Sequence, residues 1–440
     1  MSHNLARLAP ILALVASSTV GMVAPQSAAA ASANSLDLTA TYSVNANFSW
    51  AARSVSVQTI ASVRNTSGGP VTSLDFNLTP LVLGHAHVGT VRANGTAAAS
   101  SVSDQTLVVT LPSTLAAGGS VSVEIDYTAT LNSNSKGVRW LFARTTEMTA
   151  YRWIPWLSRP INFAANRRGD PWVTPLSPRV EVTITTDRKL KIASTGQRTA
   201  VSANHLTQTF VATNVRDFNF TAAPNYRVRS RIVSIPGGSS VKVKLYYRYL
   251  PARKVLKLVT RALRAYSANV GPYAYPVLNI GEVDRHAAPI ESPEHFWIPV
   301  NTSSRLLPWS VTHETGHQWF YAVVGNDQVN QPFADEAVVD FMARNLVDSW
   351  AKSPSRCGVQ DLDRSISYYG SCYAWVIYVQ GNLYLRDYYN YVGAAKFWAG
   401  LHDYYAAYRW QFGGTRQVLD SLDAAAGVNY PFYKRFPTLY

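Results

Sequence analysis

A short motif of two histidines and a glutamate lies in the second half of the chain. His313 and His317 lie on either side of Glu314 in the run His-Glu-Thr-Gly-His, and the surrounding apolar residues are typical of a helix. Residues four apart share one face of a helix, so both imidazoles can reach a single Zn²⁺ ion. Glu314 lies part of a turn away, where its carboxylate can contact a water molecule instead of the metal. The motif therefore predicts a zinc site with a general base beside it.

A third metal ligand is predicted at Glu336, which follows His317 after eighteen intervening residues and opens a second helical pattern. Two histidines and one carboxylate leave a fourth position for water, which is the arrangement of catalytic zinc and differs from the closed sites of structural zinc. Asp340 lies four residues beyond Glu336 on the same helical face, where it could orient a ligand histidine. For both acidic residues, an ordinary solvated helix face is the alternative.

The elements that must position these residues fall into two regions. From residue 35 to residue 230, alternating and β-branched runs separated by Gly, Pro, Asn and Ser turns predict an antiparallel β domain. From residue 231 to residue 440, apolar residues also recur at helical spacing, so we expect a second domain of helices and strands. Strands are expected near 277–283 and 295–300, and helices near 251–269, 304–324, 335–346, 373–391 and 394–408. The predicted fold class is α+β.

The N-terminus has the pattern of a secretory signal peptide, which we place at residues 1–31. Arg7 precedes an apolar run from Leu8 to Ala24, and small residues ending near Ala30 follow. A membrane helix is the alternative, but the apolar run is shorter than the roughly 20 residues that a bilayer requires. No later stretch approaches that length, so we expect a secreted, extracellular protein without a membrane span.

The chain has two cysteines, Cys357 and Cys372. They are too few for a zinc site built on cysteine. In an oxidising compartment we expect them to pair as a disulfide, and two reduced thiols are the alternative.

The composition is that of a folded protein, with 47% hydrophobic and 15% charged residues. The formal net charge of the chain is +14, and such an excess favours anionic partners. We find no nucleic-acid-binding motif, so we expect no nucleic-acid partner and a weak association with anionic cell-surface polymers. A solvated basic surface without a partner is the alternative.

Longer motifs around the zinc ligands resemble those of the gluzincin peptidases of the aminopeptidase N type. The matching runs are His-Glu-Thr-Gly-His-Gln-Trp-Phe at 313–320, Val-Gly-Asn-Asp at 324–327 and Pro-Phe-Ala-Asp-Glu-Ala at 332–337. The resemblance implies a β-rich N-terminal domain, a thermolysin-like α/β catalytic domain, one zinc ion per chain and peptide or protein substrates. It also implies a short form of the family, because the large C-terminal helical domain of many relatives has no counterpart after these motifs.

Two further residues gain a role from the same resemblance. Tyr378 lies in Tyr-Val-Gln-Gly, which is similar to the family's Tyr-x-Lys-Gly and implies that its hydroxyl stabilises the oxyanion of the tetrahedral intermediate. Tyr373 is the alternative donor, and packing is the alternative role. Glu291 lies where the family has Gly-x-Met-Glu-Asn, which implies that it binds the free amino group of the substrate. Ala288 and Ser292 depart from that pattern, so the specificity stays open.

Together these residues predict a secreted zinc metallopeptidase, most simply an aminopeptidase that releases N-terminal residues. A zinc endopeptidase and a non-catalytic binding protein that retains a metal site are the alternatives. The departures around Glu291 favour the endopeptidase, whereas the complete set of ligands, base and tyrosine is evidence against the binding protein.

Overall fold

The computed structural model describes residues 35–133, 141–144, 146–166, 170, 172–350 and 357–440. The predicted signal peptide at 1–31 lies outside the described residues. Within the described ranges, no helix has both the length and the apolar character that crossing a bilayer would require.

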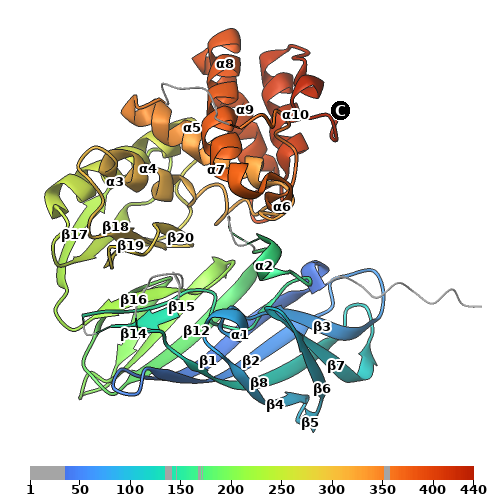
Figure 1. The fold of residues 1–440 in the computed structure, drawn as a ribbon, viewed down its shortest axis with the longest axis vertical. Coiled ribbons are helices and arrows are strands. Elements are labelled where there is room, and N and C mark those ends of the chain that lie inside the picture. Colours follow the sequence, from blue (N-terminus) through green and yellow to red (C-terminus); the bar gives the residue numbers. More distant parts are fainter. Residues whose placement is uncertain (1–34, 134–140, 145, 167–169, 171, 351–356) are drawn as a thin grey trace, which may run out of the picture. The chain divides into compact units, whose positions relative to one another are not determined.

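The N-terminal region is built from strands that form three sheets (Figure 1). These strands are β1 (Thr39–Ser49), β2 (Ser54–Arg64), β3 (Val71–Asn77), β4 (His87–Ala93), β5 (Thr96–Ala97), β6 (Ala99–Ser103), β7 (Thr106–Leu115), β8 (Ser120–Thr130), β9 (Leu141–Ala143), β10 (Met148–Ala150), β11 (Trp156–Leu157), β12 (Ser177–Thr186), β13 (Lys191–Ser194), β14 (Gln197–Val201), β15 (Thr207–Val215) and β16 (Phe220–Ala223). Three short helices, η1 (Ser35–Asp37), α1 (Pro80–Leu83) and α2 (Phe163–Asn166), lie between them in the chain.

The largest of these sheets has the strand order β14-β15-β12-β1-β2-β8-β4-β5. Its long strands alternate buried and exposed residues, and in β1 the side chains of Tyr42, Val44 and Phe48 are buried. Neighbouring strands are antiparallel except β1 and β12, which pair in parallel with Tyr42 opposite Val180. The two four-stranded sheets have the orders β13-β16-β10-β9 and β11-β3-β7-β6. The predicted antiparallel domain is therefore interrupted by one parallel pair.

The second region contains a mixed sheet of five strands. These are β17 (Arg227–Val233), β18 (Val241–Tyr247), β19 (Val277–Val283), β20 (Ile290–Ser292) and β21 (His295–Pro299). Their order is β17-β18-β19-β21-β20, with parallel pairs in the centre and an antiparallel pair at each edge. The predicted domain boundary between residues 230 and 231 falls inside β17, so the chain enters this sheet a few residues earlier than the boundary.

Helices make up most of the rest of this region (Figure 1). They are α3 (Ala252–Asn269), α4 (Leu307–Gly316), η2 (Pro332–Ala334), α5 (Glu336–Val347), α6 (Ile366–Tyr369), η3 (Gly370–Cys372), α7 (Tyr373–Trp375), η4 (Val376–Gly381), α8 (Asn382–Val392), α9 (Ala394–Ala407), α10 (Thr415–Ala426) and η5 (Phe432–Lys434). Cys357 and Cys372 form a disulfide that ties the segment before α6 to η3. The spacing of Val255, Val259 and Leu263 gives α3 a buried apolar face, as the helical pattern predicts.

Two predicted helices differ from the observed ones. Helix α4 ends at Gly316, so the prediction of one helix over 304–324 is wrong in its second half. The chain turns back there, and Phe320 forms a β-bridge with Val324. Residues 319–324 are buried, and apolar residues in a buried turn resemble a helical pattern in the sequence. The helix predicted over 373–391 is divided into α7, the π-helical segment η4, and α8.

Arg216 joins the two regions of the molecule. It follows β15, is 1% exposed, and donates hydrogen bonds to the carbonyls of Thr174 (3.2 Å), Val323 (3.4 Å) and Gln411 (2.8 Å). Gly325 leaves room for this side chain, because a Cβ there would lie 2.3 Å from Cζ of Arg216. Burial lowers the pKa of Arg216 to about 10, so the guanidinium stays charged at neutral pH.

Candidate active site

Helices α4 and α5 bring the predicted metal ligands together. His313 lies on α4, His317 is the first residue after it, and Glu336 is the first residue of α5. The two helices pack against each other, and Gly316 makes their approach close. A Cβ at Gly316 would lie 2.8 Å from Cγ1 of Val339, so a side chain there would force the helices apart. The glycine within the motif thus helps to set the distance between the histidines and Glu336.

The three ligand atoms face a common point. Nε2 of His313 and Nε2 of His317 are 3.1 Å apart, and Oε2 of Glu336 is 3.2 and 3.4 Å from them, respectively. Ligands at about 2.0–2.1 Å from a tetrahedral zinc ion are separated by about 3.3 Å, so the observed spacings fit this ion. Oε2 of Glu336 is buried and has no hydrogen-bond partner among the described residues. The three residues can therefore hold a metal ion.

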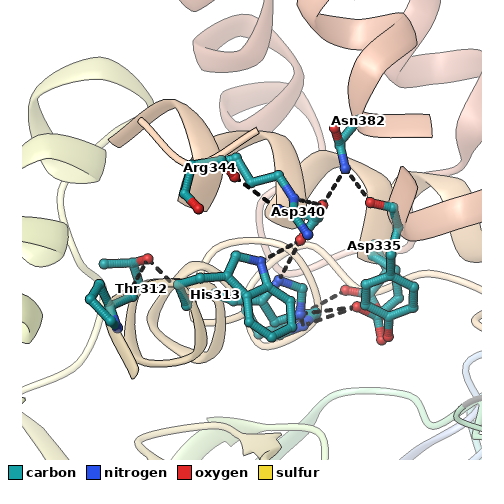
Figure 2. Close-up of polar contacts among 12 residues, drawn as sticks. Thr312, His313, Asp335, Asp340, Arg344 and Asn382 are labelled. Carbon is teal, nitrogen blue, oxygen red and sulfur yellow. Dashed lines mark hydrogen bonds and ion pairs between the residues drawn. The ribbon is translucent and has the colours of Figure 1, made fainter. Parts of the chain in front are cut away.

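Carboxylates lie behind both histidines (Figure 2). Nδ1 of His317 is 2.8 Å from Oδ1 of Asp335, and Nδ1 of His313 is 3.7 Å from Oδ1 of Asp340. A carboxylate in this place fixes the orientation of the imidazole and directs Nε2 toward the metal. Asp340 lies behind His313 without a hydrogen bond to it, since Nδ1 of His313 has no such partner among the described residues, and its predicted role stays a prediction. Asp335 does form a hydrogen bond with His317. It was not predicted, although its position directly before Glu336 is a signal that could have identified it.

Asp340 is itself held by donors from three elements. Nε1 of Trp309 and Nε of Arg344 each donate to it at 2.6 Å, and Nδ2 of Asn382 also donates to it (Figure 2). The amide of Asn382 donates to the carbonyl oxygen of Tyr378 as well. Asp340 therefore connects α4 and α5 to the segment that carries Tyr378. Burial raises the pKa of Asp340, and the charge of Arg344 opposes this effect.

Glu314 is buried beside the metal ligands. One carboxylate oxygen of Glu314, one of Glu291 and a ring nitrogen of His317 lie within 4.8 Å of one another. Burial raises the pKa of Glu314 well above its usual range, and the neighbouring carboxylates raise it further, while His317 opposes them. Oε2 of Glu314 has no hydrogen-bond partner among the described residues. This carboxyl group is thus placed to exchange a proton with a molecule in the site.

Both candidate tyrosines lie at the site. The ring of Tyr378 is 5.8 Å from that of His313. The ring of Tyr373 is 5.9 Å from that of Tyr378. Burial and the charge of Glu336 raise the pKa of Tyr378, so its hydroxyl remains a donor at neutral pH. Tyr378 contacts the ring of His313, which favours it over Tyr373 as the donor to a substrate.

Glu291 lies on β20, at the edge of the sheet and next to the ligands. Burial raises its pKa to about 7, and His317 opposes this shift. The neighbouring Ser292 anchors the strand, because its Oγ donates to Oδ1 of Asp217 at 2.6 Å. Nε2 of Gln318 donates to the carbonyl oxygen of Ser292 at 2.8 Å. The serine at this departure from the family pattern therefore ties β20 to the N-terminal region and keeps Glu291 in the site.

The site residues line a cavity of about 470 Å³. Its lining includes the metal ligands, Glu314 and Tyr378, and also Asp170, Ala288, Pro289, Glu291, Trp309, Arg344, Tyr373 and Trp375. Asp170 comes from the segment between α2 and β12 and was not predicted. Burial raises its pKa, and the charge of Glu291 adds to this effect. No local motif marks Asp170, because only the folding of the N-terminal region against the second one brings it to the cavity.

No protein-family model matches the sequence, and no curated protein matches it either. Solved structures match over most of the chain. The crystal structure of an M1 zinc metallopeptidase from Deinococcus radiodurans matches with a TM-score of 0.69 and 18% identity, covering 88% of this chain and 90% of that one. A mutant M1 zinc metallopeptidase from the same organism, bound to a Tyr-Ser-Ala substrate, matches with a TM-score of 0.68 and 16% identity, covering 89% and 92%. A two-domain M1 zinc metallopeptidase mutant bound to L-arginine gives a TM-score of 0.69 and 17% identity, covering 89% and 91%.

These matches establish the fold of the chain. It is that of a two-domain M1 zinc metallopeptidase, with an N-terminal β region followed by a region of helices and strands that carries the site. The predicted α+β class is confirmed, and so is the resemblance to the aminopeptidase N type at the level of the fold.

Proposed function

We propose that this protein is a zinc metallopeptidase that acts as an aminopeptidase. The observation that carries the proposal is the buried convergence of His313, His317 and Glu336, with Glu314 beside them. Structural zinc sites are closed by four protein ligands, so a three-ligand set next to a buried carboxylate supports a catalytic site. The Tyr-Ser-Ala substrate bound to a solved structure of the same fold supports a peptide as the substrate.

The residues of the site have separate roles in peptide hydrolysis. The two imidazoles and one carboxylate suit Zn²⁺, which when bound supplies a Lewis acid that activates water. Glu314 accepts a proton from the attacking water and donates it to the leaving amine. Tyr378 donates a hydrogen bond to the oxyanion that develops at the peptide carbonyl. This route forms no covalent intermediate with the protein, so it requires no nucleophilic serine or cysteine.

Two carboxylates on the cavity wall support specificity for a free N-terminus. Glu291 is buried and Asp170 is partly buried, and neither forms an ion pair with a Lys or Arg among the described residues. The α-ammonium group of a peptide would neutralise them through charge-assisted hydrogen bonds. An internal peptide segment brings no such cation and would leave both carboxylates without a positively charged partner, which is costly.

We also propose that the protein is exported. The sequence pattern at 1–31 supports this location, and so does the disulfide between Cys357 and Cys372, because such bonds persist in oxidising compartments. N-terminal sequencing of the protein recovered from culture medium tests the proposal. A start near residue 32 is expected, whereas retention of the intact chain inside the cell would contradict export.

The activity is tested with one panel of peptides, each prepared with a free and with an N-acetylated N-terminus. The zinc-loaded protein should release single N-terminal residues from the free peptides alone, and both a chelator and Glu314→Ala should abolish the release. Internal cleavage of the acetylated peptides would establish an endopeptidase instead. If neither set is cleaved in a zinc-dependent way, the catalytic proposal is wrong and a binding protein replaces it.

A further inference from the structure

The positive charge of the chain is concentrated in one segment. Between Asp217 and Glu282 the sequence has eleven Lys and Arg residues and no Asp or Glu, although the formal charge of the whole chain is only +14. This segment forms β17, β18 and α3. One of the eleven, Arg248, is buried and paired with Glu147 and Glu282. The other ten are exposed or half-exposed, and no ion pair joins any of them to another described residue.

Four of these side chains meet in a groove between β17 and α3. Strand β17 is at the edge of its sheet, and α3 packs against β17 and β18 (Figure 1). Arg229 and Arg231 share one face of the strand at a spacing of about 7 Å, and Arg253 and Lys257 share one face of the helix at about 6 Å. The groove has a volume of about 690 Å³ and is lined by Arg229, Ser230, Arg231, Arg253, Leu256 and Lys257. We call it the cationic groove.

The cations of the cationic groove form no ion pair with any described residue. Its lining contains no acidic residue. Arg231 donates to Oγ1 of Thr260 at 3.4 Å, whereas the charged groups of Arg229, Arg253 and Lys257 form no hydrogen bond within the described part of the chain. Like charges held close together repel one another, so this arrangement becomes favourable when an anion enters.

We propose that the cationic groove binds a linear polymer that carries phosphate groups along its backbone. Guanidinium groups bind phosphate through two parallel hydrogen bonds, and Lys257 adds a fourth positive charge. Two parallel rows of cations suit an extended anionic chain better than a single ion. The cationic groove shares no lining residue with the cavity of the candidate active site, so a bound polymer leaves that site open and tethers the protein.

Two other anionic partners fit the cationic groove less well. The exposed apolar residues Val228 and Ile232 alternate with Arg229 and Arg231 along β17 and therefore face away from them. A membrane surface would need apolar side chains beside the cations. The lining also contains no aromatic ring on which the bases of single-stranded nucleic acid could stack. The cationic groove is thus suited to a polymer that is recognised only through the charge of its backbone phosphates.

The test is a titration of labelled inorganic polyphosphate of defined length with the zinc-loaded full chain, followed by fluorescence anisotropy at several salt concentrations. The double variant Arg253→Gln and Lys257→Gln should weaken binding about tenfold at low salt and reduce the slope of log K against log salt by about 0.7 for each cation removed. Arg188 and Lys189, an exposed pair in the N-terminal region, provide the matched control. Their replacement by Gln should change binding less than twofold.

Several results would overturn the proposal. If polyphosphate does not bind even at low salt, the cationic groove is not a site for such a polymer. An equal loss of affinity for polyphosphate in both double variants would mean that binding depends on the net charge of the protein and not on the cationic groove. Tighter binding of single-stranded DNA or of anionic lipid vesicles, at equal phosphate concentration, would assign the groove to those partners. Peptide hydrolysis by the Arg253 and Lys257 double variant should equal that of the wild type, which separates this test from that of the catalytic proposal.

Discussion

Two clusters of carboxylates are buried in this protein, one around Arg248 and the other around the metal ligands. In the first, Glu147 and Glu282 both pair with the guanidinium of Arg248. Glu282 also accepts hydrogen bonds of 2.7–2.9 Å from the backbone N–H groups of Arg248, Tyr249 and Leu250. This cluster contains its own cation and its own donors.

The second cluster contains Glu291, Glu314, Asp335 and Glu336 around the two histidines. No Lys or Arg of the described residues pairs with any of these four carboxylates. Its two imidazoles must be neutral to bind a metal ion, so the positive charge of the metal-bound cluster has to come from outside the chain. Buried carboxylates can therefore belong to a structural cluster or to a binding site. The presence or absence of a paired Lys or Arg distinguishes the two.

The largest expected effect is the loss of turnover caused by a substitution in the second cluster. Glu314→Gln removes the proton acceptor without changing the shape of the side chain, so kcat should fall by roughly 10² to 10⁴. Zinc content, measured on the purified protein, should stay at one ion per chain. Glu181→Gln, at a half-exposed position on β12, is the control and should leave kcat unchanged. A variant at Glu314 with normal turnover would remove this residue from the mechanism.

A substitution in the first cluster should change the stability of the protein instead of its turnover. Arg248→Met leaves Glu147 and Glu282 buried without their cation, which should lower the free energy of unfolding by about 3 to 5 kcal/mol. Urea unfolding followed by circular dichroism measures this loss. The folded fraction should retain normal turnover per molecule. A loss of turnover with unchanged stability would mean that this cluster, too, belongs to the site.

Glu294 extends the comparison, because it is buried and forms no ion pair with any described residue. Burial raises its pKa from 4.5 to about 8. The folded protein therefore holds a proton that the unfolded chain has lost, and this stabilisation is complete below pH 4.5 and disappears as the pH rises through 8. The free energy of unfolding should fall by roughly 3 to 5 kcal/mol between these limits. Glu294→Gln should remove this component from urea unfolding curves at pH 5 to 9, whereas a wild-type-like pH dependence in the variant would contradict the assignment.

Zinc should stabilise the protein through the second cluster. At a free zinc concentration about 100 times the Kd, the gain in the free energy of unfolding should be about 2.7 kcal/mol. Thermal unfolding of the chelated protein before and after zinc addition measures this gain. His317→Ala should abolish this gain. Arg248→Met should show the same gain, although its free energy of unfolding without zinc is lower. A gain that survives His317→Ala would place the metal elsewhere.

The smallest effect expected is a gain in stability. Glu291→Gln removes one of the crowded carboxylates, so the metal-free protein should become more stable by about 1 kcal/mol. The same change should raise the KM for free peptides, because the α-ammonium group loses a partner. Urea unfolding without zinc and steady-state kinetics with zinc provide the two measurements. Destabilisation of the metal-free variant would show that Glu291 has a structural partner like that of Glu282.

The sequence predicted those parts of the site that depend on local geometry. His313 and His317 are four residues apart, on α4 and directly after it, and Glu336 begins the next helix that the pattern marks, so their types and spacing were enough. Asp170 could not be found in this way, because its place at the cavity depends on contacts between distant segments. Asp335 could have been found, since it directly precedes a ligand at the start of a helix.

The fold shows the same limit. The strand predicted near 277–283 follows from a β-branched, apolar run, and its range agrees with that of β19. The parallel pairing of β1 with β12 involves strands more than a hundred residues apart, and no periodicity within either strand encodes that choice. The end of α4 was missed for a related reason, because burial after Gly316 requires apolar residues whether the backbone is helical or turned.

Arg216 binds the carbonyl groups of three separate segments, in a space that Gly325 leaves open. Val323 and Gln411 belong to the second region, whereas Thr174 and Arg216 itself belong to the first. Recombination that replaced one region by that of a distant relative would leave either a guanidinium without acceptors or acceptors without a guanidinium. The two regions are thus constrained to evolve together. A chimaera made at the boundary between them takes Arg216 from one parent and Gly325 from the other, so both parents must have this pair.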